Sequence, residues 1–138
     1  MRYLPAFLLI LCCLAGAGGN AQRKAVSKKK APPRVLYGTA SFYANKFNGR
    51  RTASGELFSQ QKLTAACNVL PLGTWIRVTN LRNGRSVVVQ VNDRLHVRMK
   101  RVVDLSLRAA RQLGYTGSGL ARVKVEVLGK KRPAGAAG

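Results

Sequence analysis

The chain has 138 residues, of which 25 are Lys or Arg, four are Asp or Glu and one is His, so its formal net charge is +21. This length accommodates one domain of common size, and 46% hydrophobic residues are enough for a buried core, which excludes a wholly disordered chain. Four carboxylates leave few choices for acid–base chemistry.

The first residues have the features of a secretory signal peptide. Arg2 provides a positive start, Leu4–Leu14 is an apolar run too short to span a bilayer, and Gly19-Asn20-Ala21 is similar to a cleavage site. We therefore predict a signal peptide over 1–21, export to the periplasm or outer envelope, and no transmembrane span. A lipid anchor on one of the two cysteines of this segment stays open, although neither follows a small residue.

Two basic segments flank the predicted domain. Residues 22–34 are rich in Lys and Arg and contain no acid, and we predict a disordered arm there, with a second basic disordered tail over 129–138. The domain between them, 35–128, still carries a large positive charge. Because an exported protein rarely meets nucleic acid, we expect none as a partner and expect anionic envelope polymers as additional partners.

Four segments have the alternation of β-strands. Val35–Tyr43 is rich in β-branched and aromatic residues, and Thr74–Thr79 alternates strictly. An Asn-Gly pair then predicts a hairpin turn before Ser86–Val91. Ala121–Val127 places its three valines on one face and Lys and Glu on the other.

One helix is predicted, over Ser106–Leu113. Either Asp104 or Ser106 is suited to cap its first turn, and Gly114 occupies the position where a helix-ending glycine belongs. Short strands with one helix in fewer than 100 residues predict a mainly β domain, closed or half-closed into a small barrel.

Seven short motifs follow one another along the predicted domain. They are Gly38-Thr-Ala-Ser-Phe-Tyr43, Thr52-Ala-Ser-Gly-Glu56, Leu70-Pro-Leu-Gly-Thr74, Val78-Thr-Asn80, Asn83-Gly-Arg85, Asn92-Asp-Arg94 and Asp104-Leu-Ser106. In this order they resemble the rare lipoprotein A family of secreted lytic transglycosylases. The resemblance covers about Tyr37 to Leu128 and implies a six-stranded double-psi β-barrel with one short α-helix, a fold shared with expansins.

The resemblance also implies a reaction. Lytic transglycosylases cleave the bond between N-acetylmuramic acid and N-acetylglucosamine in peptidoglycan without water, because the C6 hydroxyl of the muramic sugar attacks its own C1 and leaves a 1,6-anhydro end. Such a step needs an acid for the leaving oxygen and a base for the C6 proton. One carboxyl group is able to serve as both in turn if its pKa is raised by burial or by a neighbouring carboxylate.

The resemblance assigns catalytic roles to three carboxylates. Glu56 matches the family's catalytic Glu, Asp93 matches an Asp that orients the sugar or stabilises positive charge at C1, and Asp104 matches a third acid of the groove. The residues by themselves leave other interpretations open. Glu56 would serve equally as a solvated loop carboxylate, Asp93 as an Asx turn paired with Arg94, and Asp104 as the helix cap.

Substrate binding is assigned by the same resemblance to Tyr43, Cys67, Asn92 and Arg94. Two positions depart from the family pattern. Many members have His where this chain has Cys67, and many continue with Gly-Pro-Phe where this chain has Leu95-His96-Val97. A thiol does not supply the donors of an imidazole, so Cys67 would instead pack as a small buried residue, and His96 is a candidate for part of the missing function.

We therefore predict an exported endolytic peptidoglycan lytic transglycosylase, a lyase with Glu56 as its acid and base, that acts on peptidoglycan glycan strands. The alternative is a catalytically silent, expansin-like barrel that only binds glycan. The proposed chemistry needs no metal and no organic cofactor, and we expect a monomer.

Overall fold

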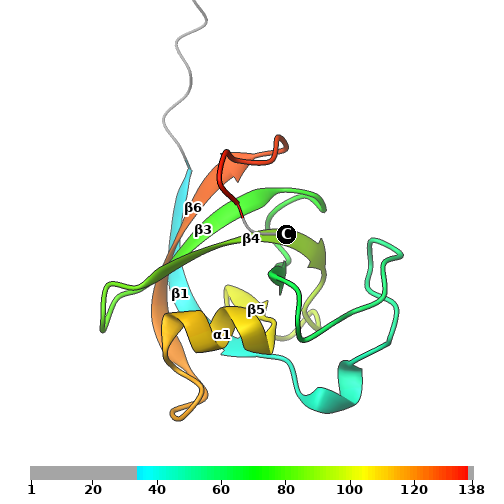
Figure 1. The fold of residues 1–138 in the computed structure, drawn as a ribbon, viewed down its shortest axis with the longest axis horizontal. Coiled ribbons are helices and arrows are strands. Elements are labelled where there is room, and N and C mark those ends of the chain that lie inside the picture. The colour runs from blue at the N-terminus through cyan, green and yellow to red at the C-terminus, as the bar shows by residue number, and fades with distance from the viewer. Residues whose placement is uncertain (1–33, 137–138) are drawn as a thin grey trace, which may run out of the picture. The chain divides into compact units, whose positions relative to one another are not determined.

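The computed structural model describes residues 34–136, so the predicted signal peptide and most of the predicted basic arm lie outside the described residues. Six strands form a closed barrel in the order β1-β5-β2-β4-β3-β6 (Figure 1). The prediction of a mainly β, six-stranded barrel with one short α-helix is confirmed. The elements are β1 (Val35–Phe42), the 3-10 turn η1 (Asn45–Phe47), β2 (Thr64–Ala66), β3 (Trp75–Asn80), β4 (Ser86–Asp93), β5 (Val103–Leu105), α1 (Leu107–Leu113) and β6 (Ala121–Gly129).

The long strands bury alternate side chains inside the barrel, as their sequence pattern predicts. Ile76 and Val78 of β3 pair with the β6 segment that contains Val125, and all three side chains are fully buried. Each such burial stabilises the fold by about 1.5–3 kcal/mol. On the outer face between the same strands, Arg77 lies 3.9 Å from the carboxylate of Glu126, so Glu126 is an ion-pair partner on the barrel wall.

The two short strands provide the parallel pairings of the barrel. β5 runs parallel to β1, and β2 runs parallel to β4, while all the other pairs are antiparallel. Residue patterns alone do not predict these strands, because three residues are too few to show an alternation with period two. They nevertheless lie between β1 and β4 in the closed barrel, so the barrel cannot close without them.

The N-terminus of α1 is capped by Ser106 and not by Asp104. The Ser106 hydroxyl accepts a hydrogen bond from Ala109 N and donates one to the carbonyl of Lys62. Asp104 belongs to β5, where its carboxylate points to other partners. The interpretation of Asp104 as a helix cap is therefore wrong, because the chain is still extended at that residue.

The C-terminus of α1 ends as predicted, at a glycine. Gly114 has a φ of 75°, which is a left-handed conformation that favours glycine. The side-chain amides of Asn80 and Asn83 both donate to the carbonyl of Leu113, at 2.9 and 2.8 Å. The β3–β4 turn that contains the Asn-Gly pair thus satisfies the end of the helix.

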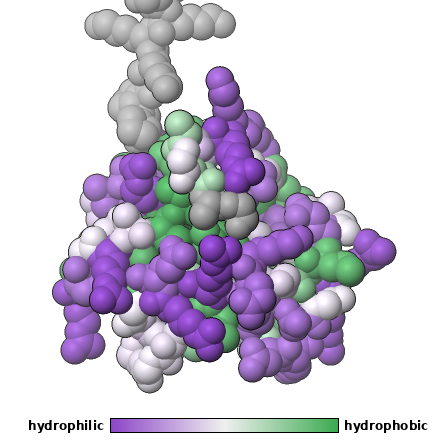
Figure 2. Space-filling model, in the orientation of Figure 1, coloured by the Kyte–Doolittle hydropathy of each residue, from purple (hydrophilic) through white to green (hydrophobic). Residues whose placement is uncertain are grey.

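Two residues beyond Gly129, in the segment expected from the sequence to form a basic tail, contact the barrel. Lys130 donates to the carbonyl of Leu72, and the Arg132 guanidinium lies over the ring of Trp75, 5.6 Å from its centroid. None of the helices within 34–136 is long and apolar enough to cross a membrane. The face in view is covered largely by hydrophilic side chains with separate apolar areas (Figure 2).

Removing the cap of α1 tests this description of the fold. Ser106→Ala deletes the hydroxyl that bonds Ala109 and Lys62, so we expect the free energy of unfolding to fall by about 1–2 kcal/mol in urea denaturation. Ser86→Ala is the control, because Ser86 is exposed, and its change should stay within about 0.5 kcal/mol. Equal effects of the two substitutions would contradict the capping role.

Candidate active site

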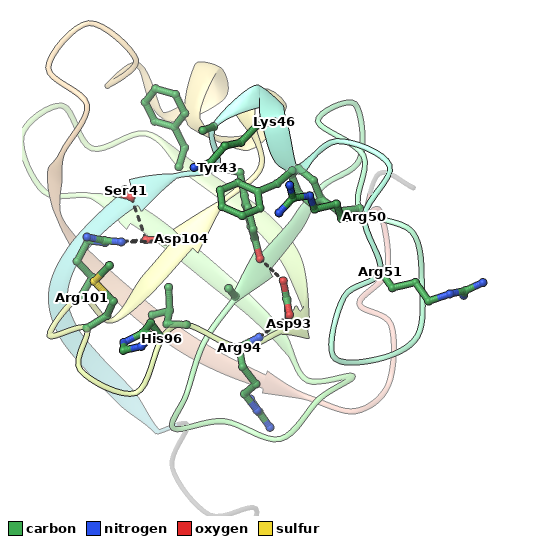
Figure 3. A pocket seen from close by; sticks show the side chains of 17 residues that line it. Ser41, Tyr43, Lys46, Arg50, Arg51, Asp93, Arg94, His96, Arg101 and Asp104 are labelled. Carbon is green, nitrogen blue, oxygen red and sulfur yellow. Dashed lines mark hydrogen bonds and ion pairs between the residues drawn. The ribbon is translucent and has the colours of Figure 1, made fainter.

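One end of the barrel carries a cavity of about 640 Å³. Its lining comes mainly from two stretches of chain and one short strand. The first stretch is the end of β1, η1 and the loop that follows η1, the second is the end of β4 with the loop after it, and the strand is β5. Figure 3 shows its charged and polar side chains converging from these segments, with Arg51 extending away from the others. These side chains are Ser41, Tyr43, Lys46, Arg50, Arg51, Asp93, Arg94, His96, Arg101 and Asp104.

The register of four strands brings two of the predicted acids to this cavity. Ser41 pairs with Asp104, Asp104 pairs with Ala66, and Ala66 pairs with Asp93, across β1, β5, β2 and β4. The two carboxylates thus flank the small side chain of Ala66, and their Cα atoms are two strand spacings apart, roughly 10 Å. Ala66 leaves open space between them.

A register shift turns Asp93 toward the cavity. Val87, Val89 and Val91 face the core, and strict alternation along β4 would turn Asp93 inward with them. Between Ala65 and Ala66 the pairing with β4 skips one residue, so that Asn92 is buried directly after Val91 and Asp93 faces outward. Such bulges commonly re-aim a side chain at a functional site.

Three neutral donors hold the Asp93 carboxylate. The Tyr43 hydroxyl donates to Oδ2 at 2.6 Å, and the backbone N–H groups of Ala53 and Arg94 donate to Oδ1 at 2.9 and 2.8 Å. Arg94 does not form the ion pair that the Asx-turn interpretation expects. Its guanidinium donates instead to the carbonyls of Cys67 and Leu70.

Asp104 has a different set of partners. Its Oδ1 accepts from the Ser41 hydroxyl at 2.9 Å and from Arg101 Nε at 2.8 Å, and its Oδ2 accepts from Arg101 Nη2 at 3.1 Å. The hydrogen bond to Asp104 raises the pKa of Arg101, against the opposing effect of burial. Asp104 is therefore the centre of a bidentate ion pair on the cavity wall.

Glu56 lies in a loop beside the cavity and is not part of its lining. The loop is a short hairpin closed by Thr52 N, which donates to the Glu56 carbonyl at 2.8 Å, and it turns at Gly55, whose φ is 90°. Ser54 N donates to the Asn92 carbonyl, and Ala53 is bonded to Asp93, so the loop is fixed to the end of β4. The exposed Glu56 carboxylate accepts a hydrogen bond from the Ser54 hydroxyl at 3.2 Å and forms no ion pair within residues 34–136.

The other predicted site residues divide into two groups. Tyr43 and Arg94 line the cavity together with Asp93 and Asp104, whereas the side chains of Cys67 and Asn92 are buried and do not. Cys67 has no exposed surface, which agrees with its interpretation as a packing residue. His96 is exposed and lines the cavity, and its Nδ1 accepts from Arg98 N at 3.3 Å.

An aromatic wall of the cavity was not predicted from the sequence. The Tyr43 ring packs against Phe58, with centroids 4.1 Å apart, and against Phe47 at 5.9 Å. Lys46 and Arg50 both lie over the Phe47 ring, at 5.2 and 5.4 Å from its centroid. Aromatic side chains at this spacing carry no periodic signal, so only the folded loop brings them together.

The cavity lacks the donor set of a metal site. Within the part of the chain that the structure describes, no group of three or more His, Cys, Asp and Glu side chains is placed to hold a metal ion. The arrangement instead offers two fixed carboxylates, a third on the adjoining loop, an aromatic wall and several cations. These groups suit the binding of a polar, elongated molecule and acid–base chemistry on it.

Comparison with known families gives a match over most of the barrel. The family model described as lytic transglycolase, a double-psi β-barrel family, matches residues 36–125. Proteins named endolytic peptidoglycan transglycosylase RlpA are similar: one from Pasteurella multocida is 47% identical over 102 residues, which cover 74% of this chain and 35% of the relative. One from Pseudomonas aeruginosa is 54% identical over 91 residues, covering 66% and 27%. The chain thus spans about a third or less of the length of these relatives.

Solved structures show the same fold at lower identity. An expansin from Clavibacter michiganensis matches with a TM-score of 0.56 and 24% identity, covering 74% of this chain and 53% of the expansin. A papain inhibitor from Streptomyces matches with a TM-score of 0.56 and 19% identity, covering 68% and 94%.

Alkaline pH tests the environment of the tyrosines. Burial, the hydrogen bond to Asp93 and the nearby carboxylates raise the pKa of Tyr43, and burial with the charge of Asp104 raises the pKa of Tyr115. The unfolded chain therefore loses these protons first, and the free energy of unfolding should fall as the pH rises past about 10. In urea denaturation across this range, the Tyr43→Phe/Tyr115→Phe variant should lose less stability than wild type. An identical loss would contradict the raised pKa values.

Proposed function

Because this chain belongs to the lytic transglycolase family of double-psi β-barrels, we propose that it is an endolytic peptidoglycan transglycosylase of the cell envelope. It cleaves the bond between N-acetylmuramic acid and N-acetylglucosamine and leaves 1,6-anhydro ends. The single observation that carries this proposal is that the Asp93 carboxylate lines the cavity and accepts a hydrogen bond from the loop that contains Glu56. Export by a signal peptide over 1–21 is part of the proposal.

Glu56 is the proposed acid and base. It first gives its proton to the glycosidic oxygen as the bond to C1 breaks, and the resulting carboxylate then accepts the proton of the C6 hydroxyl that attacks C1. Its exposure leaves the carboxylate accessible to a strand that lies across the loop, and within residues 34–136 its one side-chain partner is the Ser54 hydroxyl. A strand that fills the cavity and continues across the loop would bring a glycosidic bond to Glu56.

Asp93 is the proposed stabiliser of positive charge at C1. Its three neutral donors fix the direction of the carboxylate without cancelling its charge, as an electrostatic contribution to the transition state requires. Tyr43 contributes to this orientation through its hydroxyl and to sugar binding through its ring. Arg94 fixes the Cys67 and Leu70 carbonyls beside the cavity.

The alternative is a barrel that binds glycan without cleaving it. Two observations favour it: Glu56 is not among the residues that line the cavity, and the position of the family's His is occupied by the fully buried Cys67. Both functions share the peptidoglycan strand as ligand and differ only in whether the bond is broken.

Substitution of Glu56 distinguishes the two functions. We expect wild type to release fragments with 1,6-anhydro ends from intact or peptide-stripped sacculi, detected by mass spectrometry, and Glu56→Gln to release none while its melting temperature changes by only a few degrees. Glu126→Gln is the matched control, because Glu126 lies on the barrel wall outside the cavity and should keep the activity. Binding without products from wild type would establish the silent barrel.

Substitutions at Asp93 and Tyr43 separate charge from orientation. Asp93→Asn removes the negative charge, so kcat should fall roughly a hundredfold or more. Tyr43→Phe keeps the charge and removes one of its three donors, so its loss should be clearly smaller. Equal losses in the two variants, measured as anhydro ends released per unit time, would show that Asp93 acts only through its hydrogen bonds.

A further inference from the structure

The cavity carries more positive charge than a neutral polysaccharide requires. Lys46, Arg50, Arg94 and Arg101 line it, with Arg51 at its margin and extending away from the others, against the two carboxylates of Asp93 and Asp104. Sugar hydroxyl groups hydrogen-bond equally well to neutral side chains. A cavity with this excess of cations is therefore suited to a strand that also carries anionic groups.

Among the cations that line the cavity, Arg101 is held in place by an ion pair with a carboxylate. Asp104 holds its Nε and Nη2 atoms in a bidentate pair, and the Ser41 hydroxyl in turn holds Asp104 (Figure 3). The Arg101 side chain is only 27% exposed. An arginine ordered before binding loses little further rotamer freedom when a ligand arrives, which favours affinity.

The remaining donors of Arg101 are free for a ligand. Within residues 34–136, its Nη1 atom has no hydrogen-bond acceptor, whereas the Arg94 guanidinium is already occupied by two backbone carbonyls. Oδ1 of Asp104 accepts two hydrogen bonds and Oδ2 a third. This carboxylate is thus committed to its partners and poorly placed to exchange a proton with a sugar.

We propose that Asp104 is a positioning residue for Arg101, and that Arg101 binds a carboxylate of the substrate, so that the cavity selects carboxylate-bearing glycan. This inference rests on the proposed function for its ligand. Peptidoglycan offers such a carboxylate in two places: on the lactyl group of a muramic sugar without peptide, and on the stem peptide. Arginine recognises either one by the same charge-assisted hydrogen bonds.

Binding to chemically modified sacculi tests the proposal. All proteins carry Glu56→Gln, so that no strand is cleaved and the result does not depend on whether the wild-type chain is catalytic. Apparent dissociation constants are measured by sedimentation at about 0.15 M ionic strength, where diffuse charge attraction is screened. Peptide-bearing sacculi are compared with peptide-free glycan strands fixed on beads, because strands without peptide cross-links are soluble, and each is used untreated and with its carboxylates converted to methylamides.

Arg101→Gln should weaken binding to untreated sacculi about tenfold and leave binding to amidated sacculi unchanged. Arg98→Gln is the matched control, because Arg98 is exposed on the same loop outside the cavity lining, and it should change binding less than twofold. An effect on the peptide-free strands assigns the lactyl carboxylate, and an effect confined to peptide-bearing sacculi assigns the stem peptide. Equal weakening by Arg98→Gln, or equal weakening on amidated sacculi, overturns the proposal.

A double-mutant cycle tests the role of Asp104. If Asp104 acts through Arg101, Asp104→Asn changes the dissociation constant when Arg101 is present and has no further effect in the Arg101→Gln background. Additive effects of the two substitutions overturn the positioning role. Arg101→Lys, which keeps the charge without the bidentate geometry, should bind with intermediate affinity, and melting temperatures identify any variant that fails to fold.

Discussion

The orientation of Asp93 depends on one register shift between β2 and β4, and the rest of the site is arranged around that carboxylate. Tyr43 reaches it from the end of β1, and Ala53 reaches it from the loop that carries Glu56. Without the shift, a charged side chain would enter a core of valines, where an unpaired carboxylate costs several kcal/mol. The register shift between β2 and β4 therefore keeps the Asp93 carboxylate out of the core, and the cost of burying that carboxylate disfavours the unshifted register.

In a chain with so few acids, each carboxylate is distinguished by its partners. Asp104 and Glu126 are paired with cations, Asp93 is held by neutral donors, and Glu56 has one hydroxyl. Carboxyl groups in such different surroundings are suited to different roles, and the proposed mechanism accordingly uses Glu56 for proton transfer and Asp93 for charge stabilisation. In our proposal the surplus of basic residues then adds a preference for anionic ligands without supplying the chemistry.

The sequence predicts those parts of the fold that repeat along the chain. The long strands, the Asn-Gly turn and α1 with Gly114 follow from alternation and capping. The three-residue strands β2 and β5 have no period, and the double-psi connection came from family resemblance alone. The contact between Tyr43 and Asp93 joins residues 50 positions apart, and the outward turn of Asp93 contradicts the alternation of its own strand. Patterns along a chain do not contain such distant contacts. The pairing of Arg101 with Asp104 is different, because the two residues are only three positions apart in the sequence.

The strand order makes closure of the barrel depend on the last strand of the chain. β6, the last strand along the chain, pairs with both β1 and β3, so the barrel has two unpaired edges until this segment is in place. Non-local pairings of this kind form slowly, because the loops between them must close first. Asp93 and Asp104 lie on earlier strands and β2 sets their spacing, yet the barrel that contains these strands is closed only with β6. A chain that lacks β6 would therefore have the residues of the site without the closed barrel that supports their arrangement.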